Sequence, residues 1–354
     1  MRLLLAFILF LSTVLAQRIE YYDDWRPDAA GEGCFASQGG LYYLIRKGLE
    51  ENGLSVRHWD RKTHLPWLLR WKSVKSWEDF KHWLGFDLPR REVLEEDTLY
   101  LVITGIGLSL KDLALEKIPQ KKLIFFSWEP PTVDPRSWEP KLLNLFHKVY
   151  TWDDSLVDNK RFFKFHLPYM AKRLDELVPY EERKFLTLIA SRMQSKHPND
   201  LYAEREKLIR FFEAHPEFEF DLYGRFWEKR EFSCWRGTIP DKMAVLKQYR
   251  FAIAYENCYK EGYITEKLWD CLAAGVVPIY WGASNIEEVL PKDCFLDRRQ
   301  FKDDLELVTF LEKMSKEEWE GYVERGGRFL LSETAKKFTV EAYAQSVVEA
   351  VSTL

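Results

Sequence analysis

Cysteine is scarce in this sequence, and its spacing excludes the usual cysteine-based metal sites. The chain has five cysteines in 354 residues, Cys34, Cys234, Cys258, Cys271 and Cys294. No Cys-x-x-Cys pair occurs, and the odd count leaves at least one thiol unpaired. We therefore expect these residues to be small buried side chains, with one disulfide as the alternative.

An excess of charge of one sign, sequence repeats and low-complexity tracts are also missing. The formal net charge of −4 argues against nucleic acid as a partner. Hydrophobic residues make up 46% of the chain and charged residues 31%, which is typical of a globular protein. Because 354 residues exceed one ordinary core, the length predicts two domains.

Only one long apolar run is present, at residues 3–16. A helix of that length spans about 21 Å, which is short of the ~30 Å hydrocarbon core of a membrane. The small-residue pattern at Val14–Ala16 predicts a cleaved signal peptide over residues 1–17, and a short signal-anchor is the alternative. Either interpretation implies the secretory pathway or membrane association, in a Golgi-like lumen or a bacterial envelope.

Strand-like and helix-like patterns alternate along the rest of the chain. Short apolar runs, typical of strands buried on both faces, occur at 18–22, 99–104, 123–127, 148–151, 162–167, 184–191, 218–223, 251–255 and 276–281. Helices are expected at 41–52, 201–214, 243–249, 265–274, 305–314, 316–331 and 340–351. This order predicts an α/β protein with mostly parallel sheets in two domains, 18–170 and 184–335, followed by a C-terminal helix in 336–354.

Polar residues follow the strand expected at 251–255, in the stretch Gly262–Lys267 (GYITEK). Ligands of open parallel sheets bind beyond the carboxyl ends of the strands, so this stretch faces the cleft between the domains. Thr265 is a fair N-cap, which places Glu266 and Lys267 in the first helical turn. Free N–H groups and a lysine there suit a diphosphate, and a carboxylate suits paired ribose hydroxyls. The alternative is that Glu266 complements the helix dipole and Lys267 is solvated.

Arg205 interrupts an apolar stripe on the helix expected at 201–214. Leu201, Leu208 and Phe212 lie on the same face of that helix as Arg205. A guanidinium buried without a partner is strongly destabilising, so Arg205 needs a partner or an opening. We expect it to point into the cleft, and the alternative is that it snorkels to the surface.

Glu129 ends the strand expected at 123–127. Pro130 and Pro131 follow it, and two prolines prevent the chain from continuing as a helix. A carboxylate in this position, packed beside Trp128, faces the second domain and is expected to have a raised pKa suited to a general base. The alternative is a turn residue in solvent.

The segment at 251–284, FAIAYENCYKEGYITEKLWDCLAAGVVPIYWGAS, strongly resembles the signature of the α-1,3-fucosyltransferases, family 10 of the glycosyltransferases. That signature runs F-x-x-x-F/Y-E-N, then Y-I/V-T-E-K, a helix, and P-V/I-x-x-G-x-S. The matching residues are Glu256, Asn257, Tyr263, Thr265, Glu266, Lys267, Pro278, Gly282 and Ser284. The resemblance extends back to about Phe185, and the first half is matched chiefly through FSWEPP at 126–131.

The resemblance implies a GT-B-like fold of two Rossmann-like domains, with GDP-fucose bound mainly by the second. It also implies inverting transfer of L-fucose to a hydroxyl of a glycan acceptor, in α-1,3 linkage, with an N-acetyllactosamine-type acceptor as the example. By position in the signature, Lys267 and Arg205 would bind the diphosphate. Glu266 would meet the ribose hydroxyls, Tyr263 the ribose-phosphate region, and Asn257 the guanine side.

Glu129 matches the general base of the family, through the short FSWEPP segment. One base suffices for a single displacement, and protein cations can stabilise the departing GDP, so neither a metal nor another cofactor is expected. The pairs Asp23-Asp24 and Asp153-Asp154 lack the Asp-x-Asp spacing of metal-dependent transferases and are interpreted as loop residues.

The acceptor and the linkage position stay open, because residues 42–83 match no specificity motif. Two alternatives to a fucosyltransferase also stay open. One is a related glycosyltransferase that uses another nucleotide sugar. The other is a non-catalytic sugar-binding protein on the same fold.

Overall fold

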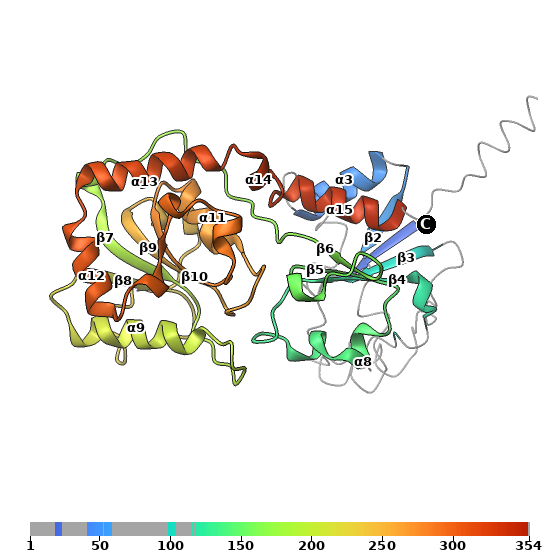
Figure 1. Cartoon of the computed structure of the whole chain (residues 1–354), viewed down its shortest axis with the longest axis horizontal. Coiled ribbons are helices and arrows are strands. Elements are labelled where there is room, and N and C mark those ends of the chain that lie inside the picture. Colours follow the sequence, from blue (N-terminus) through green and yellow to red (C-terminus); the bar gives the residue numbers. More distant parts are fainter. Residues whose placement is uncertain are drawn as a thin grey trace, which may run out of the picture.

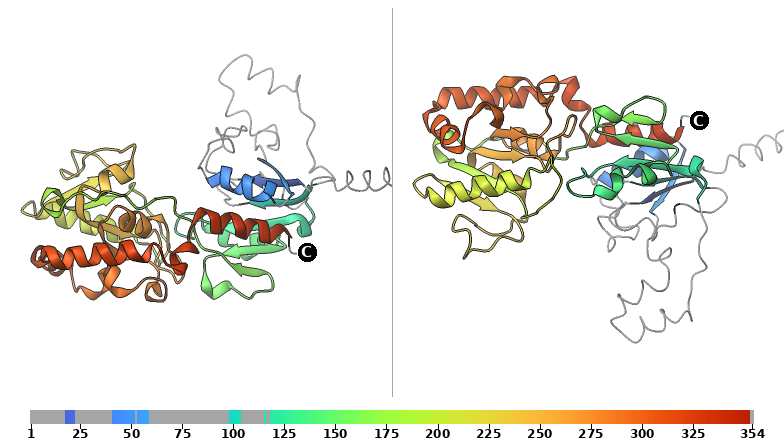
Figure 2. Two further views of the ribbon diagram at one scale, coloured as in Figure 1. Left: turned by 90° about the horizontal axis from the view of Figure 1, so that it is seen from above. Right: turned by 60° about the horizontal axis from the view of Figure 1, so that its bottom comes forward.

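The computed structural model describes residues 18–22, 41–51, 53–58, 98–103, 115 and 118–352, and these form two lobes (Figures 1 and 2). The expected signal segment, Cys34, the pair Asp23-Asp24 and most of 42–83 lie outside the described residues. In the described part of the chain, no helix is long and apolar enough to cross a membrane.

The first lobe is built on a parallel sheet with the strand order β2-β1-β3-β4-β5-β6. Its strands are β1 (Arg18–Tyr22), β2 (Ser55–His58), β3 (Thr98–Ile103), β4 (Leu123–Ser127), β5 (Lys148–Thr151) and β6 (Phe162–Lys164). Every residue of β4 is buried, because α8 (Pro140–Leu143) covers one face of the sheet and α15 (Val340–Ser352), with α3 (Leu41–Glu51), covers the other. This explains why the strand is apolar without alternation.

The second lobe has a parallel sheet with the order β11-β10-β9-β7-β8. Its strands are β7 (Lys184–Ile189), β8 (Phe220–Tyr223), β9 (Tyr249–Tyr255), β10 (Val277–Trp281) and β11 (Leu296–Asp297). Its helices are α9 (Tyr202–Ala214), α10 (Lys242–Leu246), α11 (Glu266–Ala273), α12 (Asp304–Lys313), α13 (Lys316–Phe329) and α14 (Glu333–Lys336).

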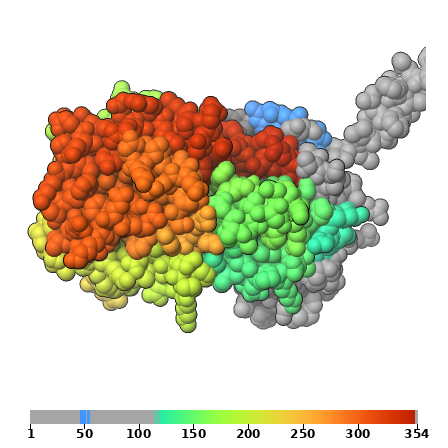
Figure 3. All heavy atoms as spheres, in the orientation of Figure 1, coloured from blue at the N-terminus to red at the C-terminus, as the bar shows by residue number. Residues whose placement is uncertain are grey.

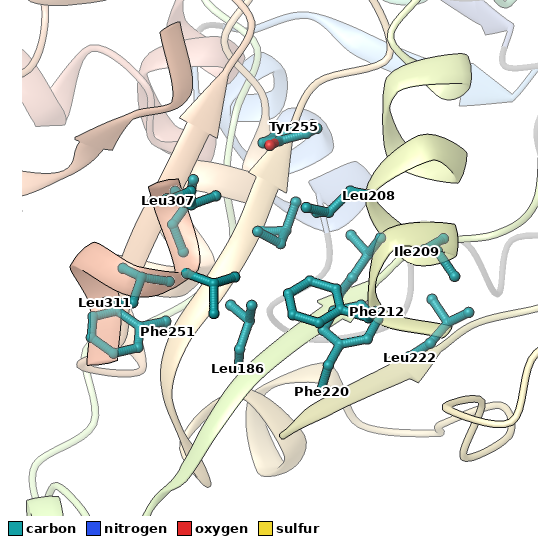
Figure 4. Packing of buried hydrophobic residues seen from close by; sticks show 14 of the residues in the cluster. Leu186, Leu208, Ile209, Phe212, Phe220, Leu222, Phe251, Tyr255, Leu307 and Leu311 are labelled. Atoms are coloured by element: carbon teal, nitrogen blue, oxygen red, sulfur yellow. The ribbon is translucent and has the colours of Figure 1, made fainter. Parts of the chain in front are cut away.

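The core of the second lobe lies on both faces of this sheet. On one face, Leu208 and Phe212 of α9 and Leu307 of α12 pack against Leu186 and Phe251 of the central strands (Figure 4). On the other face, α11 packs its own apolar side against β9 and β10. The central strands are therefore fixed on both sides, and their carboxyl ends form a rigid edge for a ligand site.

The C-terminal helix α15 (Val340–Ser352) returns to the first lobe and lies beside α3 (Leu41–Glu51) (Figure 1). Tyr343 and Val347 of α15 share a core with Ile124 and Phe126 of β4. The two chain crossings between the lobes also touch, since the Tyr169 N–H donates to the Phe338 carbonyl at 2.9 Å. The last helix therefore completes the core of the first lobe.

The predicted α/β class with parallel sheets is confirmed, and β4 and β5 have the predicted bounds. Two short strands, β2 and β11, were not predicted, because they contain too few apolar residues to form a recognisable run. The helix expected at 243–249 instead occupies Lys242–Leu246, because Tyr249 already pairs with Lys184 as the first residue of β9. The strand expected at 162–167 ends at Lys164, since the pairing with β5 ends there.

Candidate nucleotide-binding site

A small pocket opens at the carboxyl ends of β7 and β9. Its walls come from these two strands and from α9, α10 and α11. Three cationic side chains line it, Arg205, Lys242 and Lys267. The sequence predicted a site at this edge of the sheet, and the structure brings two of the predicted cations together there.

The first turn of α11 is fixed by Thr265 and by a buried carboxylate. Thr265 is the N-cap, with an extended backbone and a side chain that accepts from the Lys267 N–H. Glu256 follows β9, is 0% exposed, and accepts from both the Thr265 N–H and the Thr265 hydroxyl at 2.7 Å. Burial raises the pKa of Glu256, while Lys267 acts in the opposite direction.

Lys267 lies over its own helical turn. Its Nζ is 3.0 Å from the Thr265 hydroxyl, 3.3 Å from Glu266 Oε1 and 3.4 Å from Glu256 Oε2. A lysine at a helix N-terminus runs against the helix dipole, and a nearby anion offsets this. The structure supplies two carboxylates for this purpose, so a bound diphosphate would share or replace these partners.

Glu266 is half-exposed at the mouth of the same turn. Partial burial raises its pKa, but Lys267 and Lys242 outweigh this effect and lower the pKa to about 2. Lys242 is in turn held by Asp270, one helical turn further along α11, with Nζ to Oδ2 at 2.6 Å. The carboxylate of Glu266 therefore stays ionised, as an acceptor for hydroxyl groups.

Arg205 is 4% exposed and points into the pocket from α9. Its Nη2 donates to the Tyr255 carbonyl at 2.6 Å and to Asn257 Oδ1 at 2.9 Å. Its Nε is buried and has no hydrogen-bond partner. Burial lowers the pKa of Arg205, and Tyr202 and Glu256 counteract that effect. An unsatisfied charged donor of this kind is destabilising unless a ligand oxygen accepts from it.

Asn257 and Tyr263, the other two residues expected around the nucleotide, lie on either side of this group. The amide oxygen of Asn257 accepts from Arg205, so Asn257 orients the guanidinium. Tyr263 is 2% exposed, and its ring centroid lies 4.5 Å from that of Trp152 in the first lobe. Burial, followed by the charge of Glu129, raises the pKa of Tyr263 well above its ordinary value.

Glu129 follows β4 at the carboxyl edge of the first sheet and is half-buried. Burial raises the pKa of both Tyr202 and Tyr263 in the second lobe, and the charge of Glu129 adds to this effect. The carbonyl of Glu129 accepts from Trp138 Nε1 at 2.9 Å. Trp152 donates to the neighbouring Trp128 carbonyl and packs on Tyr263, so the turn of Glu129 lies at the junction with the second lobe. The role of Glu129 as a base stays a prediction.

The residues considered for metal or disulfide chemistry have other roles in the described part of the chain. Asp153 pairs with Lys260 at 3.2 Å and Asp154 with Lys164 at 2.5 Å. No group of three or more His, Cys, Asp or Glu side chains that could hold a metal is found within the described ranges. The four described cysteines are free and buried, Cys234, Cys258, Cys271 and Cys294.

Sequence reasoning missed the roles of Glu256 and Lys242. Glu256 gave a usable signal, because it is a carboxylate that directly follows a buried strand, as Glu129 does. Lys242 gave none, since it begins a short helix after the N-cap Asp241 and resembles any surface lysine. Only the tertiary fold brings it to Asp270 and to the pocket.

Comparison with known proteins supports the resemblance noted in the sequence. Residues 180–325 match the family described as "Glycosyltransferase family 10 (fucosyltransferase) C-term". The chain is 36% identical over 294 residues to "GDP-fucose protein O-fucosyltransferase 3" of Xenopus laevis, covering 75% of this chain and 59% of that protein. The chain is 25% identical over 291 residues to the protein of the same name in Xenopus tropicalis, covering 73% of this chain and 58% of that protein. The chain thus spans less than two thirds of the length of these relatives.

Among solved structures, an α1,3-fucosyltransferase with GDP-fucose aligns with a TM-score of 0.55 at 14% identity, over 95% of this chain and 90% of that chain. At this identity the likeness concerns the fold alone. The predicted GT-B-like architecture is confirmed by this alignment and by the two parallel sheets.

Replacing Glu266 by Gln should destabilise the protein at neutral pH, and the effect should fade in acid. Because the folded-state pKa is about 2 and the ordinary value is 4.5, the ionised carboxylate stabilises the fold above about pH 4.5. That contribution is lost as the pH falls toward about 2. Urea unfolding of both proteins at pH 7, 5, 4 and 3 measures the difference. Glu261→Gln, an exposed carboxylate of the same loop, is the control, and a pH-independent difference for Glu266→Gln would contradict the prediction.

Proposed function

The second lobe of this chain belongs to glycosyltransferase family 10, and from that premise we propose that the protein transfers L-fucose from GDP-fucose to a hydroxyl group. The observation that carries the proposal is the buried guanidinium of Arg205, which has an unsatisfied Nε and belongs to a side chain that lines a pocket together with Lys267 and Lys242. A diphosphate supplies the oxygen atoms and the negative charge that this group requires.

In the proposed donor complex, Arg205, Lys267 and the N-terminus of α11 hold the diphosphate. Lys242 adds a third positive charge to the same pocket, and Glu266 accepts hydrogen bonds from the ribose hydroxyls. Tyr263, at the junction between the lobes, packs on the ribose-phosphate side. This arrangement is supported by the three cations, which line the same pocket of the second lobe.

The proposed reaction is a single displacement with inversion. The acceptor oxygen attacks the anomeric carbon of fucose and gives its proton to a carboxylate oxygen of Glu129. The bond from the anomeric carbon to the β-phosphate oxygen breaks, and its electron pair leaves with GDP. Arg205 and Lys267 stabilise the charge that develops on the departing phosphate, so the proposed reaction requires no metal.

We propose a protein hydroxyl, on serine or threonine, as the acceptor in place of the glycan expected from the sequence signature. The support is that two named relatives, at 25% and 36% identity, are protein O-fucosyltransferases. A secretory compartment that contains GDP-fucose fits both this acceptor and the signal segment expected at residues 1–17.

Arg205→Met should weaken binding of GDP at least tenfold, because a truncated charge-assisted hydrogen bond costs about 1.5–3 kcal/mol. Calorimetric titration with GDP measures the change, and thermal unfolding verifies that the variant is folded. Arg210→Met is the matched control, since Arg210 lies on the same helix with a half-exposed side chain and pairs with Glu206. Unchanged affinity in a folded Arg205→Met protein would exclude the proposed diphosphate site.

Purified protein supplied with GDP-fucose should release GDP in the presence of serine- and threonine-containing proteins, and EDTA should leave the rate unchanged. Mass spectrometry of the products identifies the fucosylated residue. Transfer to N-acetyllactosamine alone would restore the glycan acceptor, and turnover only with another donor from a panel of nucleotide sugars would indicate a related transferase. Absence of nucleotide binding would favour a non-catalytic sugar-binding protein.

Glu129→Gln should lower kcat by about 10² to 10⁴-fold, since a general base contributes that much to a displacement. GDP affinity should stay at the wild-type value, because Glu129 is on the opposite lobe from the phosphate site. Glu139→Gln, an exposed glutamate of the same segment with no side-chain capping bond, serves as the control. Wild-type turnover by Glu129→Gln would remove Glu129 as the base.

A further inference from the structure

The turn that carries Glu129 is held by tryptophan side chains from later in the chain. The Trp128 carbonyl accepts from Trp152 Nε1 at 3.2 Å, and the Glu129 carbonyl accepts from Trp138 Nε1 at 2.9 Å. Trp152 reaches this turn because β4 and β5 run parallel with Ser127 opposite Thr151, so the residues that follow the two strands are neighbours. The backbone on both sides of the proposed base is therefore fixed by indole donors.

The same Trp152 side chain also contacts the second lobe. It is 0% exposed, and its ring lies 4.5 Å from that of Tyr263, centroid to centroid, at an interplanar angle of 50°. Tyr263 belongs to the loop that leads through Thr265 into the first turn of α11, the proposed diphosphate site. One indole thus bonds to the turn of Glu129 and packs on the loop that holds the donor.

Gly262 allows the two lobes to approach this closely. Its φ is +77°, and a Cβ atom there would lie 2.2 Å from the Trp152 carbonyl oxygen. The space-filling view shows the first lobe, in green, abutting the second lobe, in orange, along one junction (Figure 3). The backbone of Trp152 is in turn held by Lys164, whose Nζ donates to the same carbonyl at 2.8 Å.

Polar contacts on the flanks of Trp152 fix the junction further. Asp153 pairs with Lys260 at 3.2 Å, and Asn285 donates to Asp154 at 3.3 Å. Asn285 also accepts from the Gly262 N–H at 2.9 Å. The loop of the second lobe is thus anchored on both sides of the tryptophan. Rotation of one lobe against the other would separate the Asp153–Lys260 and Asn285–Asp154 pairs.

We infer that Trp152 is a positioning residue, which sets the distance from the carboxylate of Glu129 to the donor loop and so to the reacting sugar. This inference rests on the proposed function. Proton transfer in the displacement requires the base within hydrogen-bond reach of the acceptor hydroxyl, and a shift of about 1 Å costs on the order of 10²-fold in rate. A displaced base also leaves the anomeric carbon open to water. The rate of donor hydrolysis therefore rises relative to the rate of transfer.

The test compares Trp152→Phe with Trp319→Phe. Trp319 is the matched control, because it is 4% exposed and its indole donates to the Arg250 carbonyl at 2.9 Å, at the edge of the sheet away from the pocket. Both substitutions remove one indole-to-carbonyl hydrogen bond and leave a similar void. Steady-state kinetics, GDP titration and the ratio of donor hydrolysis to transfer are measured for each variant.

For Trp152→Phe we expect kcat to fall at least tenfold, up to about 10²-fold, with GDP affinity within about threefold of wild type, since the phenyl ring still packs on Tyr263. The ratio of hydrolysis to transfer should rise for this variant and stay constant for Trp319→Phe. Equal kinetic effects of the two variants, or a wild-type ratio in Trp152→Phe, would overturn the inference.

If Trp152→Phe does not fold, Lys260→Met tests the same junction. This substitution breaks the ion pair between Lys260 and Asp153 at the partly exposed flank of Trp152. A raised ratio of hydrolysis to transfer supports the inference, and an unchanged ratio overturns it. Failure of the proposed function itself is seen separately. In that case the wild-type protein does not consume GDP-fucose, or Glu129→Gln keeps full activity.

Discussion

The geometry of the site depends on one buried carboxylate. Glu256 has no exposed surface, and an ionised carboxylate is stable in such a position only when its oxygens are hydrogen-bonded and its charge is paired. Thr265 supplies an N–H and an O–H, and Lys267 supplies the charge. The first turn of α11 is consequently held where Thr265 meets Glu256. This contact also fixes the direction in which the free N–H groups of the helix point.

The same carboxylate explains why distant parts of the sequence signature belong together. A Cβ atom on Gly282 would lie 2.3 Å from Glu256 Cγ and 2.5 Å from the Tyr280 hydroxyl. That hydroxyl donates to the Tyr263 carbonyl and accepts from the Ala283 N–H. The glycine at the end of β10, the glutamate after β9 and the loop before α11 therefore form one packed unit. Their spacing along the chain reflects this packing.

Local chemistry made part of this site predictable. The buried strands β4 and β5 were predicted from continuous apolar runs. The N-cap Thr265 was predicted from its position before an apolar helix. The position of Arg205 in the pocket was predictable, because a charged side chain within an apolar helix face needs a polar partner or an opening. What could not be predicted depends on contacts through space. The pair of Lys242 with Asp270 is one example.

The return of α15 to the first lobe is another feature that local patterns do not carry. Its apolar face, which includes Tyr343 and Val347, does not indicate in the sequence which lobe it covers. In the structure it packs on β4 of the first lobe. The partners of Lys267 were missed for a related reason. Sequence spacing alone does not reveal that Glu256 folds back to within 3.4 Å of that lysine.

The charge balance of the pocket indicates which kind of ligand it favours. Lys267 and Lys242 are each paired with carboxylates, so two of the three cations are compensated before any ligand binds. Arg205 is different, because its hydrogen bonds within the described residues go to a carbonyl and an amide oxygen and not to a carboxylate. A neutral sugar would leave this charge and its buried Nε unsatisfied, whereas a phosphate oxygen satisfies both. This charge balance supports the proposed nucleotide sugar over a free sugar, and it is the physical argument against a purely sugar-binding role.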